Sequence, residues 1–394
     1  MRSIATITIG QLIADGHLTM SDGYRTKQTE LRGFGYRIIR VADVRDGEIS
    51  LASPDYVSVE YERAIGEKTG REGDVLLTTK GTVGRVALVP KLDQPIVYSP
   101  QLCFFRVSDQ SVLSRNYLRY WLKSTEFLQQ ALDRMNNTDM APYINLADIR
   151  SVQVRLPPIG DQHTTATFLS SLDDKITANT ELTVLLWAHL DAMFEQAVTR
   201  EHTTLQLNEA VDFHNRKRVP LSAQEREQRP GQVPYYGATG VFGHVDSAIF
   251  HEPLVLVGED GSVITDEGRP VVQYIWGPSW VNNHAHVLTG GSISTELLAL
   301  ALRRADIRHL VTGAVQPKIS MGKLRTLTLD LPQGEPLREL EDMCARETAL
   351  LRATVDESRT LVTLRNTLLP QLMSGKLRVR NARVTRKVVF PVQG

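Results

Sequence analysis

The sequence has little of what marks exported, metal-binding or membrane proteins. Only two cysteines occur in 394 residues, Cys103 and Cys344, and neither belongs to a Cys-x-x-Cys pair. Their scarcity excludes a disulfide framework and a zinc module, and it fits a reducing compartment. No window reaches the roughly 18 consecutive apolar residues that span a bilayer, and the N-terminus lacks an apolar segment followed by a cleavage site. We therefore expect a cytoplasmic protein without membrane contact.

An excess of either charge is also missing. The 45 Lys and Arg residues balance 45 Asp and Glu residues, so the molecule is not a polycation that binds any nucleic acid. The distribution is uneven, because residues 358–394 contain eight Lys or Arg and no acid. A chain of this length is expected to form two or three domains.

Motifs for catalysis are absent as well. The stretch TTKGTVGRV is not a P-loop, because no Gly-Lys-Ser/Thr follows a first glycine at the required distance. The stretch LPPIGD lacks the Asn or Asp before it and the aromatic residue after it that a methyltransferase uses to hold a flipped base. We therefore predict no catalytic, cofactor-binding or metal-binding residue in this chain.

Two long helical runs separate two regions of short strands and glycine turns. Apolar residues recur every three or four positions from Leu169 to Ala197 and again from Leu337 to Leu372, which is the pattern of amphipathic helices. We divide the chain into a first domain, a first helix, a second domain, a second helix and a basic tail. Their boundaries are 1–160, 161–200, 201–332, 333–378 and 379–394.

The two halves end their domains in the same way. LADIRSVQVRLPPIGDQ and MGKLRTLTLDLPQGEPL each place a strand ending in Leu-Pro directly before a long helix, which indicates an internal repeat. The globular parts between these segments show no similarity in sequence. We therefore expect a duplicated frame that carries two unlike heads.

A helix with one apolar stripe has to bury it, and the other long helix is the simplest partner. An antiparallel pair would hold the heads at the two ends of a rod about 50 to 60 Å long. A coiled-coil dimerisation element without a measuring role is the alternative. The fold class that we predict is α+β, with two globular domains joined by two long antiparallel helices that form a coiled-coil spacer.

Six segments in the order found here resemble the specificity subunits of type I restriction-modification systems. The resemblance covers nearly the whole chain, and it is the ensemble that makes it specific. The segments are LPPIGDQHTTATFLSSLDDKI, VPYYGATGVFG, VLVGEDGSV, VNNHAHVL, AVQPKISMGKLRTLTLDLP and LRNTLLPQLMSGKLRV.

The resemblance implies two target-recognition domains in a pseudo-two-fold repeat, each reading one half of a split double-stranded DNA target. It further implies that two modification (methyltransferase) subunits dock on the helices and that restriction subunits supply a motor and a nuclease. S-adenosylmethionine and ATP with Mg²⁺ would belong to those partners. This chain would be a non-catalytic subunit without a cofactor.

The resemblance also places the basic segment LRNTLLPQLMSGKLRV, residues 364–379, at the end of the second helix. Pro370 removes a backbone donor and predicts a kink or restart. Gly375 suits a helix C-cap. The tail beyond it is either close to DNA or an acidic partner surface, or a frayed and solvated end.

Donors for DNA contacts gather beside the glycine turns, where Arg and Lys can bond guanine or phosphate and Asn can bond adenine. Each of them could instead be a solvated surface charge, and the tyrosines could be buried in a plain hairpin beside Gly237, Gly240 and Gly243. The predicted DNA-binding residues are Thr79, Lys80, Thr82 and Arg85 in the first domain, and Asn215, Arg216, Lys217, Arg218, Tyr235, Tyr236 and Lys318 in the second.

Two further pairs allow more than one interpretation. His284 and His286 would share one face of a strand and bind a metal, or form a hydrogen-bonded structural pair. Glu259 and Asp260 would serve a nuclease, stabilise a turn or accept from cytosine amino groups.

We thus predict a DNA-specificity subunit that binds an asymmetric bipartite target and directs adenine methylation or restriction by its partners. Two other classes stay open: a coiled-coil scaffold whose heads bind proteins, and an enzyme with an unfamiliar site. Neither the target sequence nor the spacer length follows from the residues, because base choice depends on side-chain placement and on DNA deformability.

Overall fold

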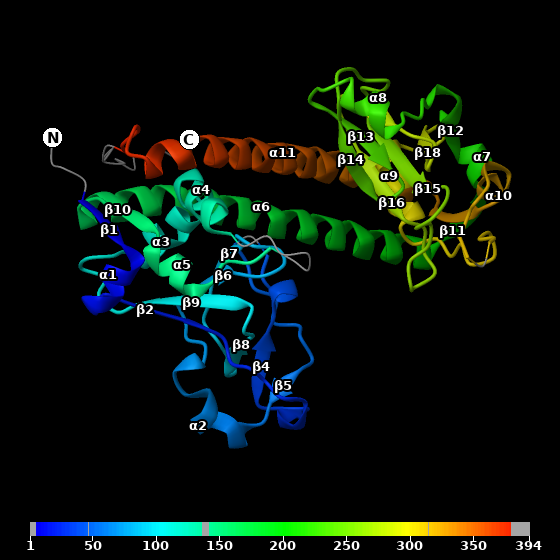
Figure 1. The fold of residues 1–394 in the computed structure, drawn as a ribbon. Coiled ribbons are helices and arrows are strands. Elements are labelled where there is room, and N and C mark those ends of the chain that lie inside the picture. The colour runs from blue at the N-terminus through cyan, green and yellow to red at the C-terminus, as the bar shows by residue number, and fades with distance from the viewer. Residues whose placement is uncertain (1–4, 46, 136–141, 314, 380–394) are drawn as a thin grey trace, which may run out of the picture. The chain divides into compact units, whose positions relative to one another are not determined.

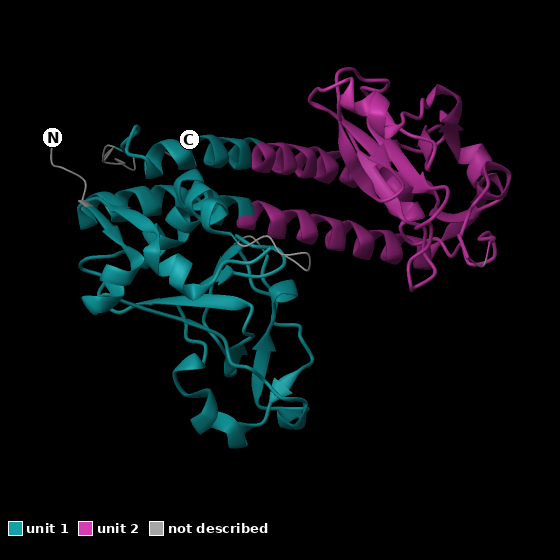
Figure 2. Cartoon of the chain, viewed as in Figure 1, with its two compact units in different colours: residues 1–176, 360–394 teal, residues 177–359 magenta. Residues whose placement is uncertain are grey.

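The computed structural model describes residues 5–45, 47–135, 142–313 and 315–379, and it alternates globular regions with long helices (Figure 1). The chain forms two compact units (Figure 2). Unit 1 comprises residues 1–176 and 360–394, and unit 2 comprises residues 177–359. Of the predicted basic tail, residues 380–394 lie outside the described part of the chain.

The globular part of unit 1 combines ten short strands with five α-helices among its described residues. The strands are β1 (Ala5–Thr8), β2 (Leu18–Asp22), β3 (Leu31–Arg32), β4 (Tyr36–Ile39), β5 (Tyr56–Val57), β6 (Val75–Thr78), β7 (Val86–Leu88), β8 (Ile96–Tyr98), β9 (Leu102–Val107) and β10 (Gln153–Leu156). The helices are α1 (Ile9–Ala14), α2 (Glu62–Ile65), α3 (Arg115–Leu122), α4 (Thr125–Arg134) and α5 (Leu146–Ser151).

The globular part of unit 2 has nine strands and four α-helices where the structure is described. The strands are β11 (His202–Gln206), β12 (Val211–Phe213), β13 (Val233–Gly237), β14 (Gly240–Val245), β15 (Leu254–Gly258), β16 (Val272–Ile275), β17 (Trp280–Val281), β18 (Ala285–Gly290) and β19 (Thr328–Pro332). The helices are α7 (Leu207–Ala210), α8 (Ala223–Glu227), α9 (Thr295–Leu302) and α10 (Met321–Arg325).

One sheet in each unit has the same strand order. Unit 1 has a four-stranded sheet in the order β2-β9-β6-β7, and unit 2 has one in the order β12-β18-β15-β16. All pairs in both sheets are antiparallel. A second sheet in each unit contains one parallel pair, β4 with β8 and β13 with β17. The two heads therefore share the order of one sheet although their sequences show no similarity, and they differ in the second sheet, which has four strands in unit 1 and three in unit 2.

Each globular part is closed by a ribbon of its first and last strands, β1 with β10 and β11 with β19. A long helix follows the last strand: α6 (Ile159–Arg200) after β10 and α11 (Gly334–Met373) after β19. Pro158 precedes the first turn of α6, and its carbonyl accepts from the backbone N–H of Asp161 at 2.9 Å. Asp161 favours this end because its charge opposes the positive end of the helix dipole.

Within unit 1, the start of α6 packs antiparallel to the end of α11. Ala166 and Leu169 share a buried core with Leu369 and Leu372. Asp173 of α6 accepts hydrogen bonds from Tyr120 of α3 at 2.6 Å and from Arg365 of α11 at 2.7 Å. Arg119 adds an ion pair at 3.3 Å. One carboxylate thus joins three helices.

Within unit 2, the rest of α6 packs antiparallel to the first part of α11. Asn179 is buried and donates from Nδ2 to Glu357 at 2.8 Å, and His189 contacts Glu347 at 2.7 Å further along. Leu190 lies in one core with Leu340 and with the buried helix α9. Each long helix therefore contributes one segment to the core of unit 1 and another to the core of unit 2.

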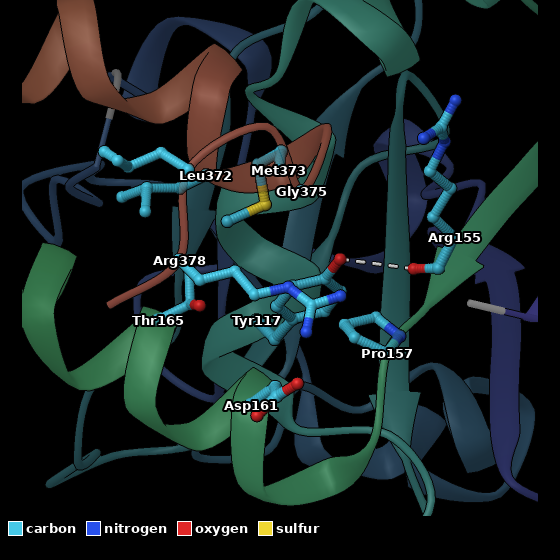
Figure 3. Close-up of a pocket in the computed structure, with 10 residues that line it drawn as sticks. Tyr117, Arg155, Pro157, Asp161, Thr165, Leu372, Met373, Gly375 and Arg378 are labelled. Atoms are coloured by element: carbon cyan, nitrogen blue, oxygen red, sulfur yellow. Dashed lines mark hydrogen bonds between the residues drawn. The ribbon is translucent and has the colours of Figure 1, made fainter. Parts of the chain in front are cut away.

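The end of α11 shows how the basic C-terminal segment is held. Gly375 has φ +73°, its N–H donates to the carbonyl of Leu372 at 3.1 Å, and Leu377 donates to Gln371 at 3.0 Å, so Gly375 is the predicted C-cap. The helix continues through Pro370 to Met373 without a restart. In Figure 3 this end lies beside Tyr117 and Arg155 in a small pocket of unit 1.

No helix in the described parts of the chain is both long and apolar enough to cross a membrane.

Asp173→Asn is expected to lower the free energy of unfolding by about 1 to 3 kcal/mol at pH 7, because charged hydrogen bonds are lost. Burial raises the pKa of Asp173, but the bonds from Tyr120 and Arg365 outweigh it and hold the pKa below 3.8. A lowered carboxyl pKa stabilises the fold above the unfolded pKa, and this contribution disappears as the pH falls through the folded pKa.

The measurement is urea unfolding at pH 7 and in steps below pH 4, with Asp174→Asn as the matched control because Asp174 is exposed. An equal decrease in the free energy of unfolding of both variants would contradict the stabilising role of Asp173.

Candidate functional site

A glycine turn between β6 and β7 carries the first group of predicted DNA-binding residues. Gly81 has φ +77° and donates to the carbonyl of Pro142 at 3.2 Å, while Ile144 donates to the carbonyl of Thr79 at 3.0 Å. The turn is therefore fastened by its backbone to residues 142–144. An ideal Cβ on Gly81 would meet no atom within 4 Å, so the glycine serves the backbone conformation and the outer side of the turn is open.

The side chains of this turn divide into two kinds. Lys80 and Thr82 are exposed, so they can reach a ligand. Thr79 is buried and its hydroxyl donates to the carbonyl of Gln101 at 2.9 Å. Arg85 is half-buried and donates to the carbonyl of Val44 at 3.2 Å. Of the four residues predicted here, two face solvent and two hold the turn in place.

The second group of predicted residues, in the turn at 215–218, divides similarly. Asn215 accepts from the N–H of Val287 at 2.9 Å and donates to His286 Nδ1 at 2.8 Å. Arg218 donates to Glu259 at 2.6 Å and to the carbonyl of Ala285 at 2.7 Å. Both side chains therefore form their hydrogen bonds to other residues of unit 2.

Arg216 and Lys217 of the same turn are exposed. The ammonium of Lys217 lies 5.9 Å from the ring centre of Phe250. These two cations, rather than their neighbours Asn215 and Arg218, are available to an anionic partner.

His286 is fully buried at the centre of this network. Its Nδ1 contacts Asn215 and its Nε2 donates to the carbonyl of Ile319 at 2.8 Å. Burial lowers the pKa of His286, which fits a neutral ring with the proton on Nε2. With both ring nitrogens engaged, His286 is a structural residue and not a metal ligand.

Tyr235 and Tyr236 lie in the core rather than on the surface, with exposed fractions of 2% and 6%. They belong to β13, which forms a hairpin with β14 in which Gly237 pairs with Gly240. The hydroxyl of Tyr235 accepts from the N–H of Leu221 at 2.9 Å. The structure thus corresponds to the plain hairpin with buried tyrosines.

The remaining predicted residue, Lys318, is exposed and pairs through its backbone with Asp260. The carboxylate of Asp260 forms a hydrogen-bond contact of 2.5 Å with Nδ1 of the half-exposed His284. Asp260 is among the predicted acceptors for cytosine amino groups, and His284 is predicted as a metal ligand or a structural residue, but the contact between them was not predicted. The similarity between TTKGTV and GEDGSV, each followed later by a Pro-x-Ile segment, is the signal that could have shown that their turn matches the turn at 79–83.

A metal site is not supported within the described residues, where no three His, Cys, Asp or Glu side chains form a group suited to hold an ion. Cys103 and Cys344 are both buried, and burial raises the pKa of Cys344 to about 12 and moves that of Cys103 upward as well. Neither thiol is a reactive nucleophile, since the thiolate is the reactive form.

Residues 20–186 match the family described as the type I restriction modification DNA specificity domain. This range holds most of the strands of unit 1 and the first two thirds of α6. The chain is thus similar to the type I restriction-modification specificity family. The predicted resemblance is confirmed.

Relatives extend this likeness. A putative type I restriction enzyme specificity subunit of Haemophilus influenzae is 27% identical over 36% of this chain and 37% of its own length. The chain thus aligns with little more than a third of that relative. The putative MjaX specificity subunit of Methanocaldococcus jannaschii is 23% identical over 91% of both chains.

The fold has a counterpart among solved structures. The crystal structure of the S subunit of a type I restriction-modification system from M. genitalium superposes with a TM-score of 0.59 at 16% identity, covering 94% of this chain and 97% of that one. At this identity the likeness concerns the fold alone. It confirms the predicted α+β class with long helices.

Arg218→Ala is expected to lower the free energy of unfolding of the chain by about 2 kcal/mol, because Glu259 would stay largely buried without its cation. Lys217→Ala is the matched control, since it removes an exposed cation from the adjacent position. Thermal unfolding of both variants followed by circular dichroism measures the difference. Similar melting temperatures for the two variants would show that the Arg218 network contributes nothing.

Proposed function

We propose that the chain is the DNA-specificity subunit of a type I restriction-modification complex and that it binds an asymmetric, bipartite DNA target. Each unit would read one half of the target, and the two long helices would set the spacer between the halves. The observation that carries this proposal is a repeated sheet. Unit 1 contains most of the matched specificity domain, and unit 2 has a four-stranded sheet with the same strand order.

The exposed side chains of the turns support sequence-specific contacts with DNA rather than unspecific electrostatic binding to it. Each unit offers a few exposed donors on a backbone fixed by hydrogen bonds, namely Lys80 and Thr82 in unit 1 and Arg216, Lys217 and Lys318 in unit 2. Groups held on rigid backbone lose little entropy on binding. A net charge of zero keeps the unspecific term small.

The long helices offer a surface for partners. Val184 and Leu185 of α6 are 63% and 65% exposed, and Leu350 of α11 is 48% exposed. Large apolar side chains left in solvent on both helices of unit 2 suit a protein interface. We assign it to the two modification subunits, with restriction subunits joining the same complex.

The chemistry would then belong to the partners. S-adenosylmethionine would bind the modification subunits and ATP with Mg²⁺ the restriction subunits, while this chain directs where adenine is methylated. The network around His286 fits this division, because its polar groups are paired with one another and none is left for a substrate.

A scaffold whose heads bind proteins is the competing function, and salt separates the two. Binding of a duplex through six or more phosphates is expected to weaken by about three orders of magnitude between roughly 50 and 200 mM salt. An interface between apolar protein surfaces responds far less. Fluorescence anisotropy of a labelled duplex with the chain and its modification subunit, measured across this range, gives the slope.

The direct test is co-expression with a cognate modification subunit followed by mapping of methylated adenines across the host genome. The proposal predicts one split motif with a fixed spacer and modified adenines on both strands. A stable complex that methylates no motif would contradict the assignment of DNA specificity to this chain.

A further inference from the structure

The turns at residues 79–83 and 259–263 occupy equivalent places in their units, as the backbone shows. Both follow the strand at the third position of the four-stranded sheet, β6 and β15. Gly81 and Gly261 have φ +77° and +78°, and an ideal Cβ on either would meet no atom within 4 Å. Each turn therefore presents an open outer side.

The hydrogen bonds that fasten the two turns correspond one by one. Gly81 donates to Pro142 at 3.2 Å, and Gly261 donates to Pro317 at 3.0 Å. Ile144 donates to Thr79 at 3.0 Å, as does Ile319 to Glu259 at 2.9 Å.

Two more backbone bonds follow the same scheme. Thr79 donates to Gln101 at 2.9 Å, and Glu259 donates to His284 at 2.9 Å. The N–H of Val83 and that of Val263 reach the glycine carbonyl of their own turn at 3.1 Å. Four pairs of corresponding hydrogen bonds therefore define one element that is built twice.

One pair of equivalent side chains on this shared backbone is inverted in charge. Lys80 of unit 1 stands where unit 2 has Asp260, and Tyr143 stands where unit 2 has Lys318. Lys80 is exposed, whereas Asp260 is 21% exposed and paired with His284. An ammonium donates to guanine O6 and N7, whereas a carboxylate accepts from the cytosine amino group.

We infer that these two turns are the base-reading loops of the two units and that the pair at the equivalent position, Lys80 and Asp260, gives the half-sites different base preferences. Lys80 reads an acceptor-bearing base such as guanine, and Asp260, positioned by His284, reads an amino-bearing base such as cytosine. This inference rests on the proposed function.

The test uses the full chain co-expressed with its modification subunit, as wild type, as Lys80→Met and as Asp260→Asn. Methylation of duplexes that differ by one base pair in one half-site is compared with methylation of the wild-type motif. We expect Lys80→Met to lower discrimination about tenfold or more at one base pair of one half-site, and Asp260→Asn to do so in the other half-site only.

Lys91→Met and Glu201→Gln are the matched controls, because both residues are exposed and lie outside the two turns. Both controls are expected to keep the wild-type selectivity. Melting temperatures of all the variants show whether each is folded. Met at position 80 keeps the length of the side chain, and Asn at position 260 keeps its shape.

Three results would overturn the inference while leaving the proposed function intact. The first is unchanged base selectivity in both variants, and the second is reduced selectivity of both variants at the same half-site. The third is a folded variant that methylates all sequences more weakly by the same factor, which is the signature of a phosphate contact. A wild-type complex without any split motif would instead overturn the proposed function, and the inference with it.

Discussion

Burial of the apolar stripes of α6 and α11 is the constraint on which the rest of the structure depends. Neither helix is stable as an isolated amphipathic rod, and each completes the core of a globular part as well as contacting the other helix. In unit 1 Leu169 and Leu372 lie in the core that contains Trp121, and in unit 2 Leu190 and Cys344 lie in the core that contains α9. A head that shares its core with a helix cannot rotate on it without exposing apolar surface, so each unit behaves as a head with its own piece of helix.

Polar contacts between the heads and the long helices make this apolar packing specific. Asp173 joins α3, α6 and α11 of unit 1, and in unit 2 Arg352 of α11 bonds Glu296 of α9 at 2.9 Å while Arg303, just beyond α9, bonds Asp191 of α6 at 3.2 Å. A buried carboxylate without its cation is costly, so such contacts favour one arrangement of each head on its helices. Polar contacts act in the same way in the turns, where the half-buried Asn215 and the buried Thr79 hold the backbone while a few neighbouring side chains stay exposed.

The sequence allowed the long helices, the internal repeat and the glycine turn at 79–83 to be predicted, because each depends on a local pattern: a helical period, a Leu-Pro before a helix, a glycine in a turn. It did not reveal that the heads share the strand order of one sheet, since strands of two to six residues pair across long separations. It also could not distinguish Arg218 from Lys217. Both are cations in one turn, and only the approach of Glu259, 41 positions away in sequence, buries the first and leaves the second in solvent.

The measurement that tests the central claim most directly is the spacer of the methylated motif after four residues are inserted in each long helix, between Glu181 and Leu182 and between Thr354 and Val355. The paired insertions keep the antiparallel contacts of Asn179 and Glu357 in step on one side and those of His189 and Glu347 on the other. Four residues add about 6 Å of helix, so the account predicts a spacer about two base pairs longer between unchanged half-sites. A motif with the original spacer would contradict it.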